Sequence, residues 1–161
     1  MERWAILDEN MNETGKIINY NELLKEGEYH LSIHAWIEDI DKKYVIQKRA
    51  KTMRNFPDMW SVVTGGVIAG EKGNEAVIRE IKEEIGIEIN KEKMKMLGIV
   101  RRQYDFVEIW KITQKIDLKN MKIQESEVSE IKLSSKEEIK EMIKQGIVAE
   151  SVIDEFYKYI L

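Results

Sequence analysis

Residues Gly65–Ile87 read GGVIAGEKGNEAVIREIKEEIGI, a glycine pair and short loop followed by a helical pattern. Apolar residues recur at helical spacing from Asn74 to Ile85, with Asn74 as a suitable N-cap and Gly86 as a left-handed stop. At about 100° per residue, the aliphatic side chains share one face and three glutamates share a neighbouring face. The aliphatic residues are Val77, Ile78, Ile81 and Ile85, and the glutamates are Glu80, Glu83 and Glu84.

This concentration of glutamates disfavours an isolated helix. Carboxylates in the last turns face the negative end of the helix dipole, which destabilises by ~0.3–1 kcal/mol each when they are exposed. Glu80 and Glu84 are also like charges four residues apart. Arg79 stands at the edge of the carboxylate face and can orient one of the glutamates. A cation between the carboxylates would offset the repulsion, and oxygen-only ligation favours Mg²⁺, with Mn²⁺ as the alternative.

The stretch resembles the Nudix box, G-x5-E-x7-R-E-U-x-E-E-x-G-U, where U is aliphatic. Every fixed position of that pattern is matched between Gly65 and Ile87. The resemblance implies an α/β fold, the Nudix-type α/β/α sandwich with a mixed central sheet. It also implies a metal-dependent pyrophosphohydrolase, in which a metal-activated water attacks a nucleoside diphosphate linked to another moiety.

The same resemblance implies a role for each box residue. The Gly65 carbonyl and the carboxylates of Glu80, Glu83 and Glu84 would bind metal, and Arg79 would orient them. Glu71 and Gly86 would support the structure of the box. One glutamate should act as the base on the metal-bound water. Glu127, in the loop at residues 124–128, is a candidate for a late ligand or base, although a plain surface acid fits equally well. The candidate catalytic residues are Arg79, Glu80, Glu83, Glu84 and Glu127.

Segments upstream of the box resemble the Nudix branch related to isopentenyl diphosphate isomerase. They are Glu28–Leu31, Val45–Arg49 and Phe56–Trp60. That isomerase relies on a catalytic cysteine just before the box, and this chain has no cysteine. It also has Gly66 where the isomerase has a metal-binding histidine. Hydrolysis is therefore expected rather than isomerisation, with a non-catalytic nucleotide-binding sensor as the second alternative.

A basic segment precedes the box and contains no acidic residue. Its charges are Lys42, Lys43, Lys48, Arg49, Lys51 and Arg54. Arg49 and Lys51 are the candidate ligands for substrate phosphates, with Arg49 the first choice because a guanidinium grips phosphate through two hydrogen bonds. The alternative is a solvated basic loop.

Length and composition set the remaining expectations. The 161 residues, 43% of them hydrophobic, predict one domain spanning residues 1–161. A net charge of −4 argues against a nucleic-acid coat, and no apolar run approaches the ~20 residues of a membrane span. The absence of cysteine excludes disulfides and thiolate metal sites. We expect a cytoplasmic protein whose partner is a small diphosphate, nucleotide-derived by the resemblance, which also suggests a homodimer.

Elsewhere the pattern predicts strands mixed with about three helices. Strands are expected at residues 4–7, 31–37, 44–47, 60–64, 96–100 and 106–116. Helices are expected at 74–85, from Ser134 to Gly146, and at 151–160, the last with Ile153, Phe156, Tyr157 and Ile160 on one side. Pro57 should hold Phe56 in an extended conformation. His30 and His34 share one face of a strand and are interpreted as ordinary sheet residues.

Overall fold

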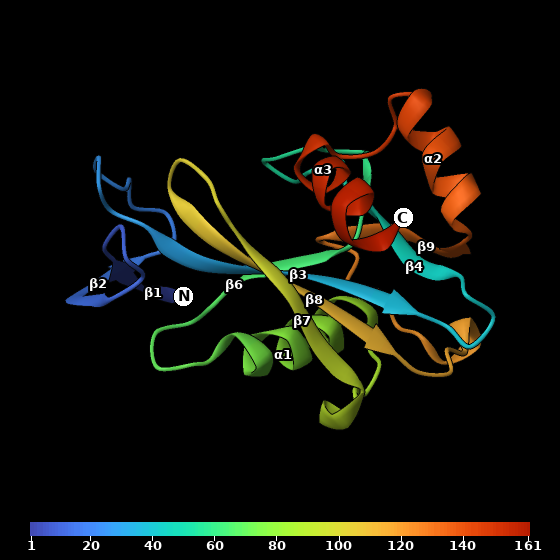
Figure 1. The fold of residues 1–161 in the computed structure, drawn as a ribbon, viewed down its shortest axis with the longest axis horizontal. Helices are drawn as coiled ribbons and strands as arrows, with labels where there is room; N and C mark the ends of the chain where they lie inside the picture. The colour runs from blue at the N-terminus through green and yellow to red at the C-terminus, as the bar shows by residue number, and fades with distance from the viewer.

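A mixed sheet lies between helix α1 (Gly73–Ile85) on one face and the C-terminal helices on the other in the computed structural model, which describes residues 1–161 (Figure 1). Its strands run in the order β5-β4-β3-β8-β7, with β6 paired to β3 and β9 paired to β4. β3 and β8 are parallel, and the other neighbouring pairs are antiparallel. The predicted α/β/α sandwich with a mixed central sheet is confirmed.

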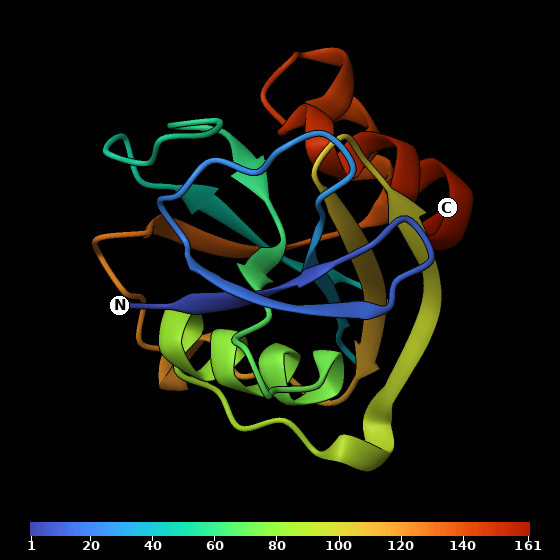
Figure 2. The same cartoon turned by 90° about the vertical axis from the view of Figure 1, so that its left-hand side faces the viewer.

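The sheet strands are β3 (His30–Glu38), β4 (Tyr44–Arg49), β5 (Trp60–Ser61), β6 (Val63–Gly66), β7 (Met94–Arg101), β8 (Asp105–Thr113) and β9 (Val128–Ser134). The C-terminal helices are α2 (Lys136–Lys144) and α3 (Ile153–Glu155), the latter continued by a π-helical turn at Phe156–Ile160. A separate hairpin of β1 (Arg3–Leu7) and β2 (Glu13–Asn19) crosses one end of the sheet (Figure 2). The N-terminal hairpin is therefore brought over the region where β6 ends in its glycine pair.

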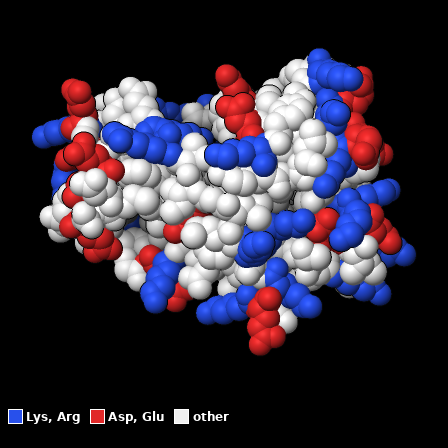
Figure 3. Space-filling model, in the orientation of Figure 1, with Lys and Arg blue, Asp and Glu red and all other residues white.

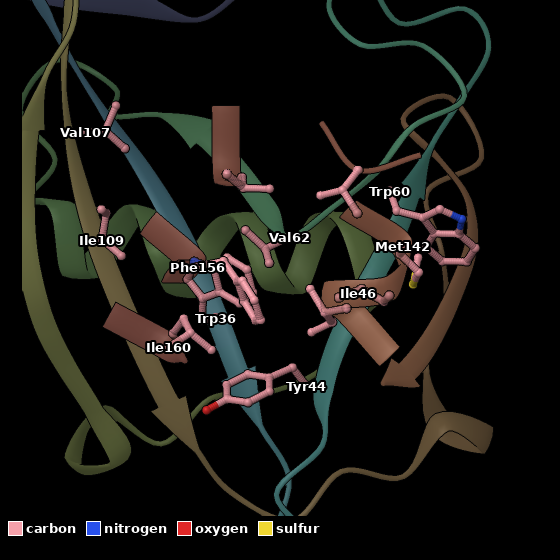
Figure 4. Close-up of a cluster of buried hydrophobic side chains, with 13 residues drawn as sticks. Trp36, Tyr44, Ile46, Trp60, Val62, Val107, Ile109, Met142, Phe156 and Ile160 are labelled. Carbon is pink, nitrogen blue, oxygen red and sulfur yellow. The ribbon is translucent and has the colours of Figure 1, made fainter. Parts of the chain in front are cut away.

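Strand β3 divides its side chains between the two faces of the sheet. Its odd-numbered residues, including Ile33 and Ile37, pack with Val77, Ile81 and Ile85 of α1. Its even-numbered Trp36 packs on the other face, in the cluster of aromatic and aliphatic side chains drawn in Figure 4. That cluster includes Trp36, Tyr44, Ile46, Trp60, Val62, Met142, Phe156 and Ile160. Burying these two sets fixes which face of the sheet receives α1 and its glutamates.

Local capping explains where the helices begin. α1 starts at Gly73 rather than after Asn74, because the backbone N–H of Lys72 donates to the Glu75 carboxylate at 2.8 Å and makes Lys72 the N-cap. α2 begins as predicted, since the Ser135 hydroxyl accepts a hydrogen bond from the backbone N–H of Glu138 at 3.1 Å. Strands β2 and β9 were not predicted, and β8 ends at Thr113 rather than at residue 116.

The last helical segment differs from the regular amphipathic helix expected at 151–160. Its final turn is π-helical, with a larger radius than an α-helix. The backbone N–H of Leu161 donates to the carbonyl of Phe156, five residues earlier, at 2.9 Å. Phe156 and Ile160 are buried, whereas Tyr157 is 46% exposed. The prediction that Tyr157 shares the apolar side is therefore wrong, because the wider turn rotates it outward.

Phe56 also departs from expectation. It adopts a left-handed backbone conformation with φ of 49°, not the extended one predicted from Pro57. Hydrogen bonds within the loop enforce this shape: Arg49 Nε donates to the Asn55 carbonyl at 2.8 Å, and the Asp58 N–H donates to the Arg49 carbonyl at 3.1 Å. The local preference before proline is outweighed by these contacts.

The surface in Figure 3 carries interspersed acidic and basic side chains, with no continuous basic area on that face. None of the helices has the length and apolar character needed to traverse a lipid bilayer.

Candidate active site

Arg79 ties the loop after β6 to the glutamate helix. Its Nε and Nη2 donate to the two carboxylate oxygens of Glu71, at 2.8 and 3.0 Å. Its Nη1 donates to Glu80 at 2.7 Å and to Glu83 at 3.4 Å. Burial alone would lower the pKa of this guanidinium, but the hydrogen bonds to Glu71 and the charge of Glu80 outweigh that effect and raise the pKa. The arginine and glutamates nominated from the sequence are thus brought together, with Glu71 bracing Arg79.

The glycines of the box leave space that other side chains fill. A Cβ on Gly65 would lie 2.2 Å from Cδ of Glu80, and a Cβ on Gly66 would lie 2.6 Å from Nε1 of Trp4. Gly86 ends α1 in the left-handed conformation, with φ of 72°. Close packing therefore requires the first two glycines, and backbone geometry requires the third.

Glu80 and Glu84 are 6% and 3% exposed, unusually buried for carboxylates. Burial raises the pKa of Glu80 to about 7, although the charge of Arg79 opposes the rise. Burial also raises the pKa of Glu84 well above its usual range; the hydrogen bond from Gln47 opposes this, and the charges of Glu80 and Glu127 add to it. Arg79 is the one cation in contact with either of these two carboxylates, and Glu71 and Glu83 share its charge. A divalent cation would supply further positive charge, so the donor set fits a metal ion.

Gln47 and the loop before β9 complete the surroundings of Glu84. Gln47 Nε2 donates to Glu84 Oε2, while Gln47 Oε1 is buried with no protein partner. Backbone hydrogen bonds hold Glu127, whose N–H donates to the Gln124 carbonyl at 2.9 Å and whose carbonyl accepts from the Ala50 N–H at 2.8 Å. Sequence reasoning missed Gln47, because only the pairing of strands brings it to α1.

The carboxylates surround a cavity rather than a preformed cage. The cavity, of about 450 Å³, is lined by Gly65, Glu80, Glu83 and Glu127, and we call it the box cavity. No three acidic or histidine side chains converge closely enough to hold an ion in this arrangement. Arg79 already engages Glu80 and approaches Glu83, so an ion would compete with the guanidinium for these oxygens.

The two basic candidates are placed differently. Arg49 lines the box cavity, with Nε bonded to the Asn55 carbonyl and Nη1 within 3.5 Å of the Thr64 hydroxyl. It forms no ion pair with a carboxylate. Lys51 is exposed in the turn after β4 and lines neither this cavity nor the one described next. Only Arg49 is brought to the glutamates.

A second cavity, of about 290 Å³, adjoins the first, and we call it the inner cavity. The two share a rim made of Trp4, Arg49, Asn55, Thr64, Gly65 and Gly66. His30, Ser32 and His34 of β3 line the inner cavity. The ring of His30 stacks on Trp4 with centroids 3.9 Å apart, and His34 Nδ1 lies 2.8 Å from Glu155 Oε2. The two histidines are thus cavity walls rather than only sheet residues. Trp4 and Glu155 gave no signal in the sequence, because they reach this region from opposite ends of the chain.

Comparison with known proteins explains this arrangement. A family model described as the NUDIX domain matches residues 28–151. The chain belongs to the Nudix family. An uncharacterized Nudix hydrolase of Listeria monocytogenes is 33% identical over 147 residues, which span 91% of this chain and 87% of that protein. The crystal structure of DR0079 from Deinococcus radiodurans superposes with a TM-score of 0.84 at 17% identity, covering 99% of this chain and 100% of that one.

A second similar structure is the bifunctional NMN adenylyltransferase/ADP ribose pyrophosphatase of Francisella tularensis, complexed with AMP and a Mn ion. Its TM-score is 0.65 at 16% identity, covering 81% of the present chain and 41% of that protein. Nudix hydrolases are generally metal-dependent pyrophosphohydrolases, and this Nudix protein is accordingly a hydrolase that acts on pyrophosphate bonds. The predicted family and enzyme class are confirmed.

Proposed function

We propose that this Nudix hydrolase is a Mg²⁺-dependent enzyme that cleaves a nucleoside di- or triphosphate, or a related organic diphosphate. The observation that supports it most is the pair of buried carboxylates on α1, Glu80 and Glu84, whose pKa values are raised beside a cavity with Arg49 on its rim. When bound, a divalent ion neutralises phosphate charge and lowers the pKa of a water molecule. The Gly65 carbonyl, Glu80, Glu83 and Glu84 would hold it, and Mn²⁺ would substitute for Mg²⁺.

The other side chains orient groups or move a proton. Glu71 fixes Arg79, and Arg79 in turn fixes the side chain of Glu80. Arg49 is not neutralised by a carboxylate, so its guanidinium is available to a phosphate group. Glu127 lines the box cavity and forms no ion pair, and we assign it as the general base that accepts the proton of the attacking water.

Release of phosphate or nucleotide from a panel of organic diphosphates tests this function. We expect turnover that is lost with EDTA and restored by Mg²⁺, and lost again in the double variant Glu83→Gln plus Glu84→Gln. Glu92→Gln, an exposed glutamate in the turn before β7, is the matched control and should keep full activity. Turnover that survives both chelation and the double substitution would contradict the metal mechanism.

The same panel separates the two alternatives. A nucleotide-binding sensor would bind members of the panel without turnover of any of them. An isomerase would convert isopentenyl diphosphate into a rearranged product of equal mass. Analysis of product masses also identifies which phosphorus is attacked, because the labelled oxygen of ¹⁸O-water appears in only one of the two products.

A further inference from the structure

The inner cavity continues the box cavity toward the C-terminal helices. The rim that the two cavities share includes Gly65, Gly66 and Arg49. If the diphosphate of a substrate lies beside the glutamates, its organic group would extend past this rim into the inner cavity. A third hollow, next to Glu150 and Asp154, shares Phe56, Arg102 and Ser151 with the inner cavity. The three hollows thus follow one another from α1 to α3, each sharing lining residues with the next.

Polar side chains dominate the inner cavity. Trp4, Ile33 and Phe56 are its only hydrophobic lining residues. The Arg102 guanidinium donates to both carboxylate oxygens of Asp105, with Nε 2.8 Å from Oδ1, so these two charges neutralise each other. Apart from Arg49 on the rim shared with the box cavity, the lining therefore offers hydrogen-bonding groups without an unpaired arginine, which suits a polar organic group better than a hydrocarbon chain.

His34 is the wall residue whose orientation is fixed most firmly. It is 3% exposed, and its Nδ1 lies 2.8 Å from Glu155 Oε2. The other oxygen of Glu155 accepts a hydrogen bond from Trp36 Nε1 at 2.8 Å, so both oxygens of this buried carboxylate are bonded. With Nδ1 in contact with the Glu155 carboxylate, Nε2 is the remaining polar atom of the ring. No protein group forms a hydrogen bond with it.

We propose that His34, held by Glu155, is a specificity-determining residue that presents Nε2 to the organic group attached to the diphosphate. The proposal rests on the hydrolase function stated above. According to this proposal, His34 and Glu155, which are 121 positions apart and lie outside the box, determine which organic group is accepted. Removing the imidazole should weaken binding of the organic part while leaving binding of the phosphates unchanged.

Nuclear magnetic resonance of protein labelled with ¹⁵N-histidine tests this directly, since the chain contains only two histidines. ADP, CDP, GDP and UDP are titrated separately in EDTA, which prevents their hydrolysis, with inorganic pyrophosphate as the probe that lacks an organic group. We expect the Nε2 resonance of His34 to shift with at least one nucleoside diphosphate and to stay in place with pyrophosphate. Absence of a shift with all four nucleotides overturns the proposal, and so does an equal shift with pyrophosphate.

Kinetics of variants provide the second measurement. His34→Phe and Glu155→Gln should lower kcat/KM for the nucleoside diphosphate that is cleaved best by about tenfold, and should change the inhibition constant of pyrophosphate less than about twofold. Glu141→Gln is the matched control, because it makes the same chemical change as Glu155→Gln at an exposed residue of α2 that lines none of the three hollows. Its selectivity should equal that of the wild type, with folding of each variant checked by urea unfolding.

The outcomes separate this inference from the proposed function. Equal loss for nucleoside diphosphate and pyrophosphate, or loss in Glu141→Gln of the same size, would show a structural role and overturn the assignment to His34. Hydrolysis that His34→Phe leaves unchanged would also refute it while sustaining the hydrolase. Absence of turnover with every diphosphate would instead refute the proposed substrates, and the resonance of His34 would still report on binding.

Discussion

Replacing Glu80 by glutamine examines the electrostatics of the box in the metal-free protein. The pKa of Glu80 is raised to about 7 from 4.5 by burial, a difference of about 2.5 units. A group with a raised folded-state pKa contributes stability that is complete below the unfolded pKa and is lost as the pH rises through the folded pKa. At ~1.36 kcal/mol per unit, the loss between pH 4.5 and pH 7 amounts to roughly 3 kcal/mol.

The assay is urea unfolding of the wild type and Glu80→Gln in EDTA across this pH range. Glutamine resembles the protonated acid, so any change in packing or in the contact with Arg79 contributes equally at each pH. The stability of each protein is compared with its own stability at about pH 4. Between about pH 4 and about pH 8, the wild type should lose roughly 3 kcal/mol more than Glu80→Gln. Adding Mg²⁺ should recover much of this difference for the wild type.

Parallel pH profiles for the wild type and Glu80→Gln would refute the reasoning, because they would mean that Glu80 ionises as readily in the folded protein as in the unfolded chain. The control is Glu92→Gln, an exposed glutamate whose substitution should leave the wild-type profile unchanged.

Three further substitutions probe the geometry of the site. Gly65→Ala places a methyl group on the Glu80 carboxylate. It should lower kcat/KM at least about tenfold, measured by phosphate release, and stability by ~1–3 kcal/mol, measured by urea unfolding. Wild-type values for both would contradict the overlap. Arg79→Lys cannot bond Glu71 through two nitrogens and reach Glu80 as well, so stability should fall by about 1–3 kcal/mol. Arg49→Ala should raise KM about tenfold with little change in unfolding, while Lys95→Ala, an exposed lysine on β7, should leave KM unchanged; equal effects would remove Arg49 from the site.

The sequence was sufficient for the parts of the site that depend on local spacing. Helix periodicity alone places Glu80, Glu83 and Glu84 on one side of α1, and Gly86 ends that helix where its lack of a side chain predicts. The contacts of Arg79 with Glu80 and Glu83 follow from the same helix. Such features lie within one element and depend on no distant partner.

Contacts between distant segments could not be predicted in this way. Gln47 meets Glu84 across 37 positions, and His34 meets Glu155 across 121, only after the sheet and the C-terminal helices have assembled. Lys51 looked equivalent to Arg49 in the sequence, yet the turn after β4 directs only one of them to the cavity. Strand β9 was missed because its polar and apolar residues alternate weakly and its pairing with β4 is interrupted by a bulge.

The alternation of side chains along β3 separates two tasks that many enzymes combine in the same residues. The side chains at its odd-numbered positions pack against the helix of carboxylates, and those at positions 30, 32 and 34 line the inner cavity, where Ile33 is the one odd-numbered neighbour. Substitutions at the even positions can therefore change which organic group is accepted while the catalytic layer keeps its support. In a directed-evolution library, these three positions are where new substrate preferences should arise without loss of the hydrolytic reaction.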